Sequence, residues 1–272
     1  MRLHLARFPG DPVFDTALSH AMLRRVAAGT APESLRLYLP ENALLFSSLD
    51  RRRPGYARAV ALAEEAGFPS VIRLAGGQAA AFLEQSVAFA WAIPDVDAHL
   101  HIRPRFEALT SWIVASLRKL GLDARVGELP GEYCPGEFSV NLEGRVKVMG
   151  VGQRVIRGGA HVGGVLTVGG SDELRATLRG VYDALGLEFR GESAGCISDF
   201  DSSLGVEDLL RAMHEVLIET GHDLESARFD ESIVREAETL MPMHHPEPRD
   251  DRGNALRASR THPKVVHHDD SD

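Results

Sequence analysis

The chain has 272 residues, of which 44% are hydrophobic and 25% are charged, and its formal net charge is −9. This length and composition are typical of a globular protein that buries a substantial core. The negative charge argues against a nucleic-acid-binding protein with a broad basic face, because such a protein must neutralise many phosphates. We therefore expect no nucleic-acid partner.

The two cysteines, Cys134 and Cys196, are too few for a disulfide framework, and no zinc-type spacing connects them with histidine. We expect free thiols in a reducing compartment and no metal site. The amino terminus lacks the apolar core of a signal peptide, and no other run is long enough to span a bilayer. The sequence thus predicts a cytoplasmic protein with no membrane partner.

Helix and strand signals alternate in the first part of the chain. Asp11 followed by Pro12 predicts a helix start, and apolar residues at near-helical spacing continue the helix to Gly29. The further elements expected up to residue 75 are a strand at 35–39, a turn at 40–42, a strand at 43–48, a helix from 55 to Gly67 and a strand at 70–75.

The middle of the chain has the clearest periodicity. The run SVAFAWAI at 86–93 is almost wholly apolar, which favours a strand buried on both faces. From Ile102 to Leu117 apolar residues recur every three or four positions, and Gly121 suits a helix C-cap. The remaining expected elements are a meander of three or four strands over 137–168, a helix capped by Ser171 and reaching about Leu185, and a helix over 206–217.

The character of the chain changes near residue 240, beyond which large apolar residues are few. We expect one α+β domain over 1–240 and a disordered, acidic, histidine-containing tail over 241–272, because the tail cannot bury enough surface to offset its ordering entropy. Its histidines are expected to be solvated rather than metal-bound: His244, His245, His267 and His268.

A lysine stands in the valine-rich hairpin that follows Cys134. Strand alternation puts Lys147 on the polar face with Ser139 and Asn141, while Val146 and Val148 face the apolar side. That face would be exposed to solvent in a protein without a site here, and it would line a cleft in an enzyme. An exposed strand lysine is common.

Composition favours the cleft. Only three of the 30 basic residues are lysines, namely Lys119, Lys147 and Lys264. Lysine differs from arginine in presenting a compact ammonium, which can point at a single carbonyl or phosphate oxygen. We therefore favour a functional role for Lys147.

Cys134 lies in a loop between Gly131 and Gly136, where its thiol can be accessible. A nearby cation would lower the pKa of this thiol and make it a nucleophile, but a loop thiol without a role fits the sequence equally well. Cys196 has no lysine near it in sequence and is interpreted as a small packing residue.

Two glycine-rich stretches are weaker signals. The segment RLAGGQA contains Arg73, Gly76 and Gly77 after a predicted strand, and paired glycines let backbone amides approach a ligand. It matches neither a dinucleotide fingerprint nor a phosphate loop, so a simple turn is the commoner explanation. His161 lies in RGGAHVGGVLTVGG, and a lone strand histidine is more often structural than catalytic.

Taken in order, four segments resemble the biotin/lipoate protein ligase superfamily, in particular its lipoate-protein ligase and octanoyltransferase branch. They are LRLYLPENALLFSS, RLAGGQAAAF, GRVKVMGVGQR and RGGAHVGGVLTV, within a resemblance that covers about residues 13–220. The resemblance implies an α+β fold, with a mixed or antiparallel β-sheet core flanked by helices.

The resemblance also implies roles for particular residues. Lys147 would contact the acyl carbonyl or the activated carboxylate, and Cys134 would be the nucleophile of the cysteine-dependent acyltransferases. The substrate-binding residues of the same cleft would be Arg73, Gly76, Gly77 and, from a partial match, His161.

The implied function is transfer of an octanoyl or lipoyl group, through a Cys134 thioester, to a lysine of a lipoyl carrier domain. No cofactor is required for this reaction. The implied partners are the glycine-cleavage H protein, the acyltransferase subunits of 2-oxoacid dehydrogenases, or an acyl carrier protein. Two alternatives stay open, namely a lipoate-protein ligase that uses ATP and Mg²⁺ and a non-catalytic sensor of acyl or biotin-like ligands.

Overall fold

Two β-sheets lie at the centre of the computed structural model, which describes residues 1–6, 8 and 10–246. The strands are β1 (Arg2–His4), β2 (Ser34–Tyr38), β3 (Ala43–Phe46), β4 (Ser70–Ile72), β5 (Ala80–Phe82), β6 (Ser86–Pro94), β7 (Ala124–Val126), β8 (Val140–Leu142), β9 (Val146–Ile156), β10 (Gly159–Thr167) and β11 (Glu225–Ser226). The larger sheet has the order β11-β1-β2-β6-β10-β9-β8-β7, and the smaller sheet has the order β4-β3-β5.

Both sheets are mixed. In the larger one, β1 pairs in parallel with β2 and β11, whereas the run from β2 to β7 is antiparallel. In the smaller one, β3 pairs in parallel with β4 and antiparallel with β5. The predicted α+β fold with a mixed sheet is confirmed.

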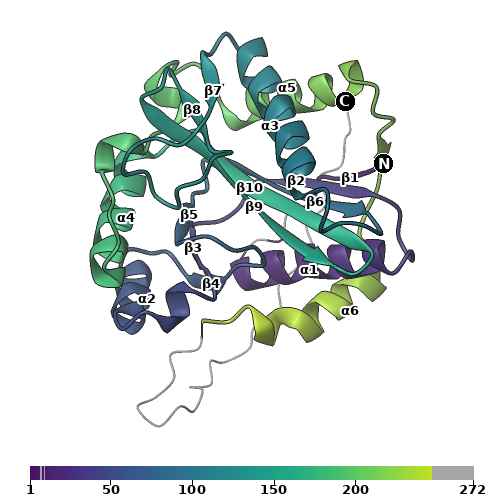
Figure 1. Ribbon diagram of the computed structural model, residues 1–272, viewed down its shortest axis with the longest axis horizontal. Coiled ribbons are helices and arrows are strands. Elements are labelled where there is room, and N and C mark those ends of the chain that lie inside the picture. Colours follow the sequence, from purple (N-terminus) through teal and green to yellow (C-terminus); the bar gives the residue numbers. More distant parts are fainter. Residues whose placement is uncertain (7, 9, 247–272) are drawn as a thin grey trace.

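Six α-helices flank the sheets in the described part of the chain. They are α1 (Pro12–Ala27), α2 (Tyr56–Glu65), α3 (Ile102–Lys119), α4 (Ser171–Leu185), α5 (Val206–Glu219) and α6 (Glu231–Leu240). They pack in pairs, α1 with α6, α2 with α4 and α3 with α5, and Figure 1 shows the three pairs at three sides of the sheets. Each pair shields a separate apolar cluster.

The expected start of α1 is correct, whereas the expected cap of α4 is wrong. Asp11 caps α1, since its carboxylate accepts hydrogen bonds from the N–H groups of Val13 and Phe14. The prediction that Ser171 caps α4 is wrong. Gly170 occupies the cap position, and the Ser171 hydroxyl donates instead to Asp199.

The antiparallel core follows the predicted pattern. β6 is buried over most of its length and pairs with β2 on one side and β10 on the other. The predicted meander over 137–168 consists of β8, β9 and β10. Glu143 and Gly144 form its first turn, both with positive φ, as a tight hairpin requires. The strands predicted at 35–39 and 43–48 exist, but β2 and β3 belong to different sheets.

Several short elements have no counterpart in the sequence analysis. β1, β5, β7 and β11 have two or three residues each, too few to show a period. Helix α6 did carry a signal, because Asp230 caps it and buried Ile233, Ala237 and Leu240 recur at helical spacing.

The first residues assigned to the tail pack against the protein. The described chain continues to residue 246, and His244 is buried, with its Nδ1 2.7 Å from the carbonyl oxygen of Ile72. The predicted solvation of His244 is therefore wrong, because this histidine binds the end of β4. Residues 247–272, with His267 and His268, lie outside the described residues.

Among the helices of the described part of the chain, none is long and apolar enough to cross a membrane. Within the same residues, no group of three or more histidine, cysteine or acidic side chains could hold a metal ion.

Candidate active site

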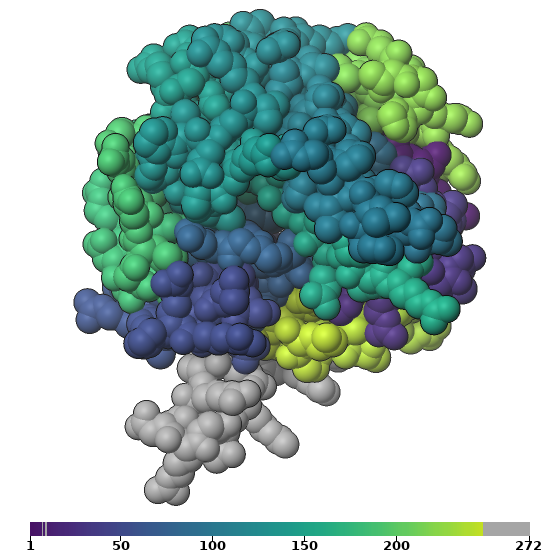
Figure 2. All heavy atoms as spheres, viewed as in Figure 1, coloured from purple at the N-terminus to yellow at the C-terminus, as the bar shows by residue number. Residues whose placement is uncertain are grey.

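A pocket of about 690 Å³, its open mouth included, lies among α1, the smaller sheet and the centre of the larger sheet. Figure 2 shows the hollow in the face of the molecule. Its wall is largely apolar and includes many small residues, which leave the space open. The lining residues are Thr16, Ser19, Tyr38, Leu45, Arg73, Leu74, Ala75, Ala80, Phe82, Phe89, Ala90, Tyr133, Cys134, Gly150, Val151, Gly152, His161, Gly163, Gly164 and Val165.

Cys134 is held in an uncommon backbone conformation at one end of this pocket. Its φ is 43°, in the left-handed region that non-glycine residues rarely adopt. Its N–H donates to the Tyr182 hydroxyl at 2.6 Å, and its carbonyl oxygen accepts from the Lys147 ammonium at 2.8 Å. Such a conformation persists only where the surroundings fix it, and these two bonds fix both sides of the residue.

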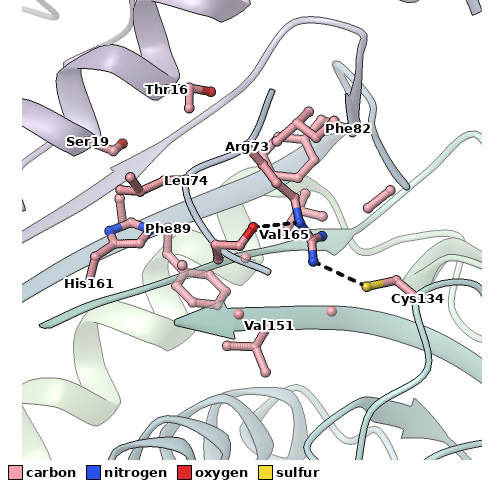
Figure 3. Close-up of a pocket in the computed structure, with 18 of the residues that line it drawn as sticks. Thr16, Ser19, Arg73, Leu74, Phe82, Phe89, Cys134, Val151, His161 and Val165 are labelled. Carbon is pink, nitrogen blue, oxygen red and sulfur yellow. Dashed lines mark hydrogen bonds between the residues drawn. The ribbon is translucent and has the colours of Figure 1, made fainter. Parts of the chain in front are cut away.

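Two donors from the glycine-pair turn reach the thiol itself. The backbone N–H of Gln78 donates to Cys134 Sγ at 3.3 Å, and Nη2 of Arg73 lies 3.5 Å from the same sulfur. Arg73 is oriented by a second bond, from its Nε to the carbonyl oxygen of Ala75 at 3.2 Å. Figure 3 shows the Arg73 guanidinium between the turn and the sulfur.

Gly77 is required for this arrangement. Its φ is 108°, and a Cβ at this position would lie 1.9 Å from Nη2 of Arg73 and 2.8 Å from Cys134 Sγ. A Cβ on Gly76 would meet no atom within 4 Å. The second glycine of the pair, rather than the first, lets the arginine and the thiol meet.

The electrostatic environment favours the thiolate. Burial alone would raise the pKa of Cys134, but the Arg73 guanidinium, the Lys147 ammonium and the Gln78 N–H outweigh it. Together they hold the pKa of Cys134 below its ordinary value. Cys134 is a half-buried residue that lines the open pocket, through which a reagent can reach it. A partly exposed thiol with a lowered pKa is the environment of a nucleophilic cysteine.

Lys147 lies beneath the Cys134 loop. Its side chain is fully buried, and its ammonium donates to Glu132 Oε1 at 2.9 Å and to the carbonyl oxygens of Tyr133 and Cys134 at 2.8 Å each. An ammonium has three N–H donors, so this set uses all of them. The Glu132 carboxylate also accepts from the Ser139 hydroxyl and from the Leu129 N–H.

This geometry refines the strand prediction. Lys147 does share a face with Ser139, as alternation predicts, because both reach the Glu132 carboxylate. The face is neither solvent nor cleft, since Glu132 and the Cys134 loop cover it and Lys147 is not among the residues that line the pocket. The prediction of a cleft at Lys147 is therefore wrong.

The predicted residues fall into two groups in space. Arg73, Gly77, Cys134 and Lys147 meet in one cluster. His161 lines the same pocket at the other end, as Figure 3 shows. Burial, with the neighbouring His20 and His244, lowers the pKa of His161 to about 4, so its ring is neutral at neutral pH.

The second cysteine has a different environment. Cys196 is fully buried, and burial raises the pKa of its thiol to about 11. The interpretation of Cys196 as a packing residue is confirmed.

Three residues of the cluster were not found from the sequence. Glu132 adjoins the Tyr133-Cys134 pair, but a glutamate in a loop gives no sign of burial. Tyr182 is on α4, 48 residues beyond Cys134, and its hydroxyl also donates to the Ala79 carbonyl oxygen at 2.8 Å. Gln78 acts through its backbone, which no side-chain pattern reveals. Only the glycine pair beside Gln78 indicated a close backbone approach.

The site is a sheet-built pocket with a thiol at one end and a glycine-pair turn beside it. A family model, the lipoyl protein ligase A/B catalytic domain, matches residues 11–186, more than half of the chain. The chain therefore belongs to the lipoyl protein ligase A/B catalytic domain family.

Individual relatives and a solved structure agree with this placement. An octanoyl-[GcvH]:protein N-octanoyltransferase of Geobacillus kaustophilus is 29% identical over 171 residues, 61% of this chain and 60% of the relative. A lipoyl-[GcvH]:protein N-lipoyltransferase of Listeria monocytogenes is 24% identical over 172 residues, 62% of each protein. The crystal structure of lipoate-protein ligase A bound with ATP superposes with a TM-score of 0.73 at 22% identity, covering 89% of this chain and 94% of that one.

The matches span about 60% of the length of these curated relatives. The solved structure, at 22% identity, shows the fold. The family and the fold follow from the comparisons.

Proposed function

We propose that this protein is an acyltransferase that passes an octanoyl or lipoyl group, through a thioester on Cys134, to a lysine of a lipoyl-domain protein. The observation that carries the proposal is the thiol at the end of an apolar pocket, beside an arginine and a backbone N–H. An acyl chain suits the apolar wall, and the cation beside the sulfur supports a thiolate nucleophile.

The reaction has two transfers. The Cys134 thiolate attacks the acyl carbonyl of the donor, and a carbon–sulfur bond forms. The bond between the carbonyl carbon and the carrier's sulfur or nitrogen breaks, and the leaving thiol or amine takes a proton from water. The amine of the acceptor lysine then attacks the thioester carbonyl, loses a proton to water and releases the Cys134 thiolate. No electrons are gained or lost in either transfer.

Arg73 and the Gln78 N–H support the charged states of the sulfur. The sulfur is negative before the first transfer and after the second, and both donors lie within 3.5 Å of it. A charge-assisted bond to a fixed donor stabilises an anion more than a neutral pair does. We assign Arg73 the role of thiolate partner.

Lys147 acts as a positioning residue in this scheme. The family resemblance implies a contact between this lysine and the acyl carbonyl. Its three donors are instead engaged by Glu132 and by the carbonyl oxygens of Tyr133 and Cys134, which supports a role in holding the loop. The positive charge of Lys147 also favours the thiolate across the loop.

The donor and acceptor are proposed from chemistry and from the names of relatives. Two relatives are named for transfer from GcvH to protein, which supports the glycine-cleavage H protein as the donor. The acceptors would be lipoyl-domain proteins such as the acyltransferase subunits of 2-oxoacid dehydrogenases. Octanoyl-loaded acyl carrier protein is the alternative donor, to be compared with the glycine-cleavage H protein.

Intact-mass spectrometry tests the proposal. After incubation with octanoyl-loaded glycine-cleavage H protein or acyl carrier protein, the protein should gain the mass of one octanoyl group. Cys134→Ser should abolish the gain, and Cys196→Ser is the matched control that should keep it. A full-strength adduct in Cys134→Ser would refute the assignment of the nucleophile.

The same assay separates the alternatives. An ATP-dependent ligase would modify a lipoyl domain from free lipoate and ATP, and Cys134→Ala would retain that activity. A sensor would bind an acyl ligand tightly but would modify no carrier. Multiple turnovers that need Cys134 and do not respond to ATP would support the transferase alone.

A further inference from the structure

The end of strand β4 lies directly before Arg73 in the chain. β4 is the outer strand of the smaller sheet, and it pairs with β3 on its inner side. An outer strand presents backbone N–H and carbonyl groups that its own sheet does not pair. The last residue of β4, Ile72, finds partners for both of its groups outside the sheet, in the segment that follows α6. Figure 1 shows the chain beyond α6 reaching β4.

His244 supplies both partners. Its carbonyl oxygen accepts from the Ile72 N–H at 2.8 Å, and Nδ1 of its imidazole lies 2.7 Å from the Ile72 carbonyl oxygen. The His244 side chain is buried, and a buried hydrogen bond is electrostatically stronger than one in water. Met241 docks the same segment independently, because it packs against the apolar clusters that contain Val13 and Val71. The segment therefore stays in place when only the imidazole is changed.

His20, on α1, orients the His244 ring from its other side. A carbonyl oxygen only accepts, so Nδ1 of His244 carries the hydrogen, and Nε2 of the neutral ring is an acceptor. Nδ1 of His20 lies 3.0 Å from this Nε2 and donates to it. Burial lowers the pKa of both rings, that of His20 to about 4, so both are neutral at neutral pH. One chain of hydrogen bonds thus runs from His20 through His244 to Ile72.

The turn that follows β4 carries both donors to the Cys134 sulfur. Arg73 is its first residue, and the Gln78 N–H lies near its end. The far end of the turn is held where the Ala79 carbonyl oxygen accepts from the Tyr182 hydroxyl at 2.8 Å. The near end depends on how firmly the last residue of β4 is fixed. Because Nη2 of Arg73 lies 3.5 Å from the sulfur, a small outward shift of the strand end would break this contact.

We infer that His244, oriented by His20, is a positioning residue for the nucleophile, since it fixes the end of β4 and so keeps Arg73 beside the Cys134 sulfur. The inference rests on the proposed function in taking Cys134 as the nucleophile. Neither histidine is among the residues that line the described pocket, so both act through Arg73 and not on the reacting atoms. The segment 241–246 thereby connects α1 to the active-site turn.

The pH dependence of Cys134 alkylation by iodoacetamide tests the inference in the full chain. His244→Leu should raise the midpoint by about 0.5 pH unit, which slows alkylation about threefold at neutral pH. His244→Asn should restore most of the rate, because its amide nitrogen takes the place of Nδ1 along the side chain and can donate to Ile72. His245→Leu, at the exposed neighbouring histidine, is the matched control and should leave the rate unchanged.

Two further variants separate positioning from folding. In the Arg73→Met background, His244→Leu should slow alkylation less than about 1.5-fold, because its effect passes through Arg73. His20→Leu, at a half-buried residue, should slow alkylation about twofold in the native background, even if His244→Leu proves insoluble.

An unchanged midpoint in His244→Leu or in His20→Leu would overturn the inference, as would equal slowing by His244→Leu with and without Arg73. Labelling of the buried Cys196 in these variants would show a general loosening of the fold and would overturn it too. Alkylation of Cys134 needs no acyl transfer. A missing octanoyl adduct in the mass assay would therefore refute the proposed function and leave this result standing.

Discussion

The regions around Cys134 and Cys196 contain the same thiol and give it opposite properties. At Cys134 an arginine, a lysine and a backbone N–H surround a partly exposed sulfur, and its pKa is lowered. At Cys196 the sulfur is fully buried, and its pKa is raised to about 11. Burial raises the pKa of both thiols, and only at Cys134 do nearby donors outweigh it, among them a guanidinium 3.5 Å from the sulfur.

Removing the buried Lys147 beneath Cys134 should have the largest effect. Lys147→Met should lower the free energy of unfolding by about 3–5 kcal/mol, because Glu132 would stay buried without its cation and two loop carbonyl groups would lose their donor. Urea unfolding followed by circular dichroism measures this change.

Lys119 is the matched control, since it pairs with Glu215 and Glu219 at the surface. Lys119→Met should change the stability little, because exposed ion pairs are screened by water. Equal destabilisation by the two variants would show that the Lys147 network is not special.

The arginine next to the sulfur should have the next largest effect. Arg73→Met should slow alkylation of Cys134 at neutral pH about tenfold, because the thiolate loses its nearest cation. Arg73→Lys should restore part of the rate, since it keeps a charge without the planar fork. Arg58→Met, at an exposed arginine on α2, is the control. An unchanged alkylation rate in Arg73→Met would show that Arg73 does not stabilise the Cys134 thiolate.

Gly77→Ala should have the smallest effect of the three. The methyl group would press on Nη2 of Arg73 and on Cys134 Sγ, and alanine resists a φ of 108°. We expect alkylation of Cys134 to slow several-fold. Gly76→Ala should slow it less, because its Cβ meets no atom within 4 Å. The reverse order of the two variants would contradict the close approach at Gly77.

Much of the fold could be predicted because its signals are local. The helices α1 and α3 and the strand β6 follow from apolar spacing, cap residues and an unbroken apolar run. The very short strands could not be found, since two or three residues show no period. The separation of β2 and β3 into two sheets was also out of reach, because a turn signal does not tell which strands pair.

The candidate site could be predicted in its residues and only in part in its geometry. Strand alternation correctly placed Lys147 with Ser139, but it could not show that Glu132 would fold over that face. Arg73 was expected to line the pocket, and its contact with the sulfur depends on the loop course of two segments 61 residues apart. Periodicity describes elements, whereas such contacts depend on how loops cross between them.

Arg73 and its neighbours hold the pKa of Cys134 below its ordinary value, whereas burial raises the pKa of Cys196. The most direct test of this difference is the pH dependence of iodoacetamide alkylation of the native protein, read at each cysteine by peptide mass spectrometry. We expect Cys134 to react with a midpoint below that of an ordinary cysteine, Arg73→Met to raise this midpoint, and Cys196 to stay unmodified. A midpoint for Cys134 at or above the ordinary value, or faster labelling of Cys196, would contradict these pKa shifts.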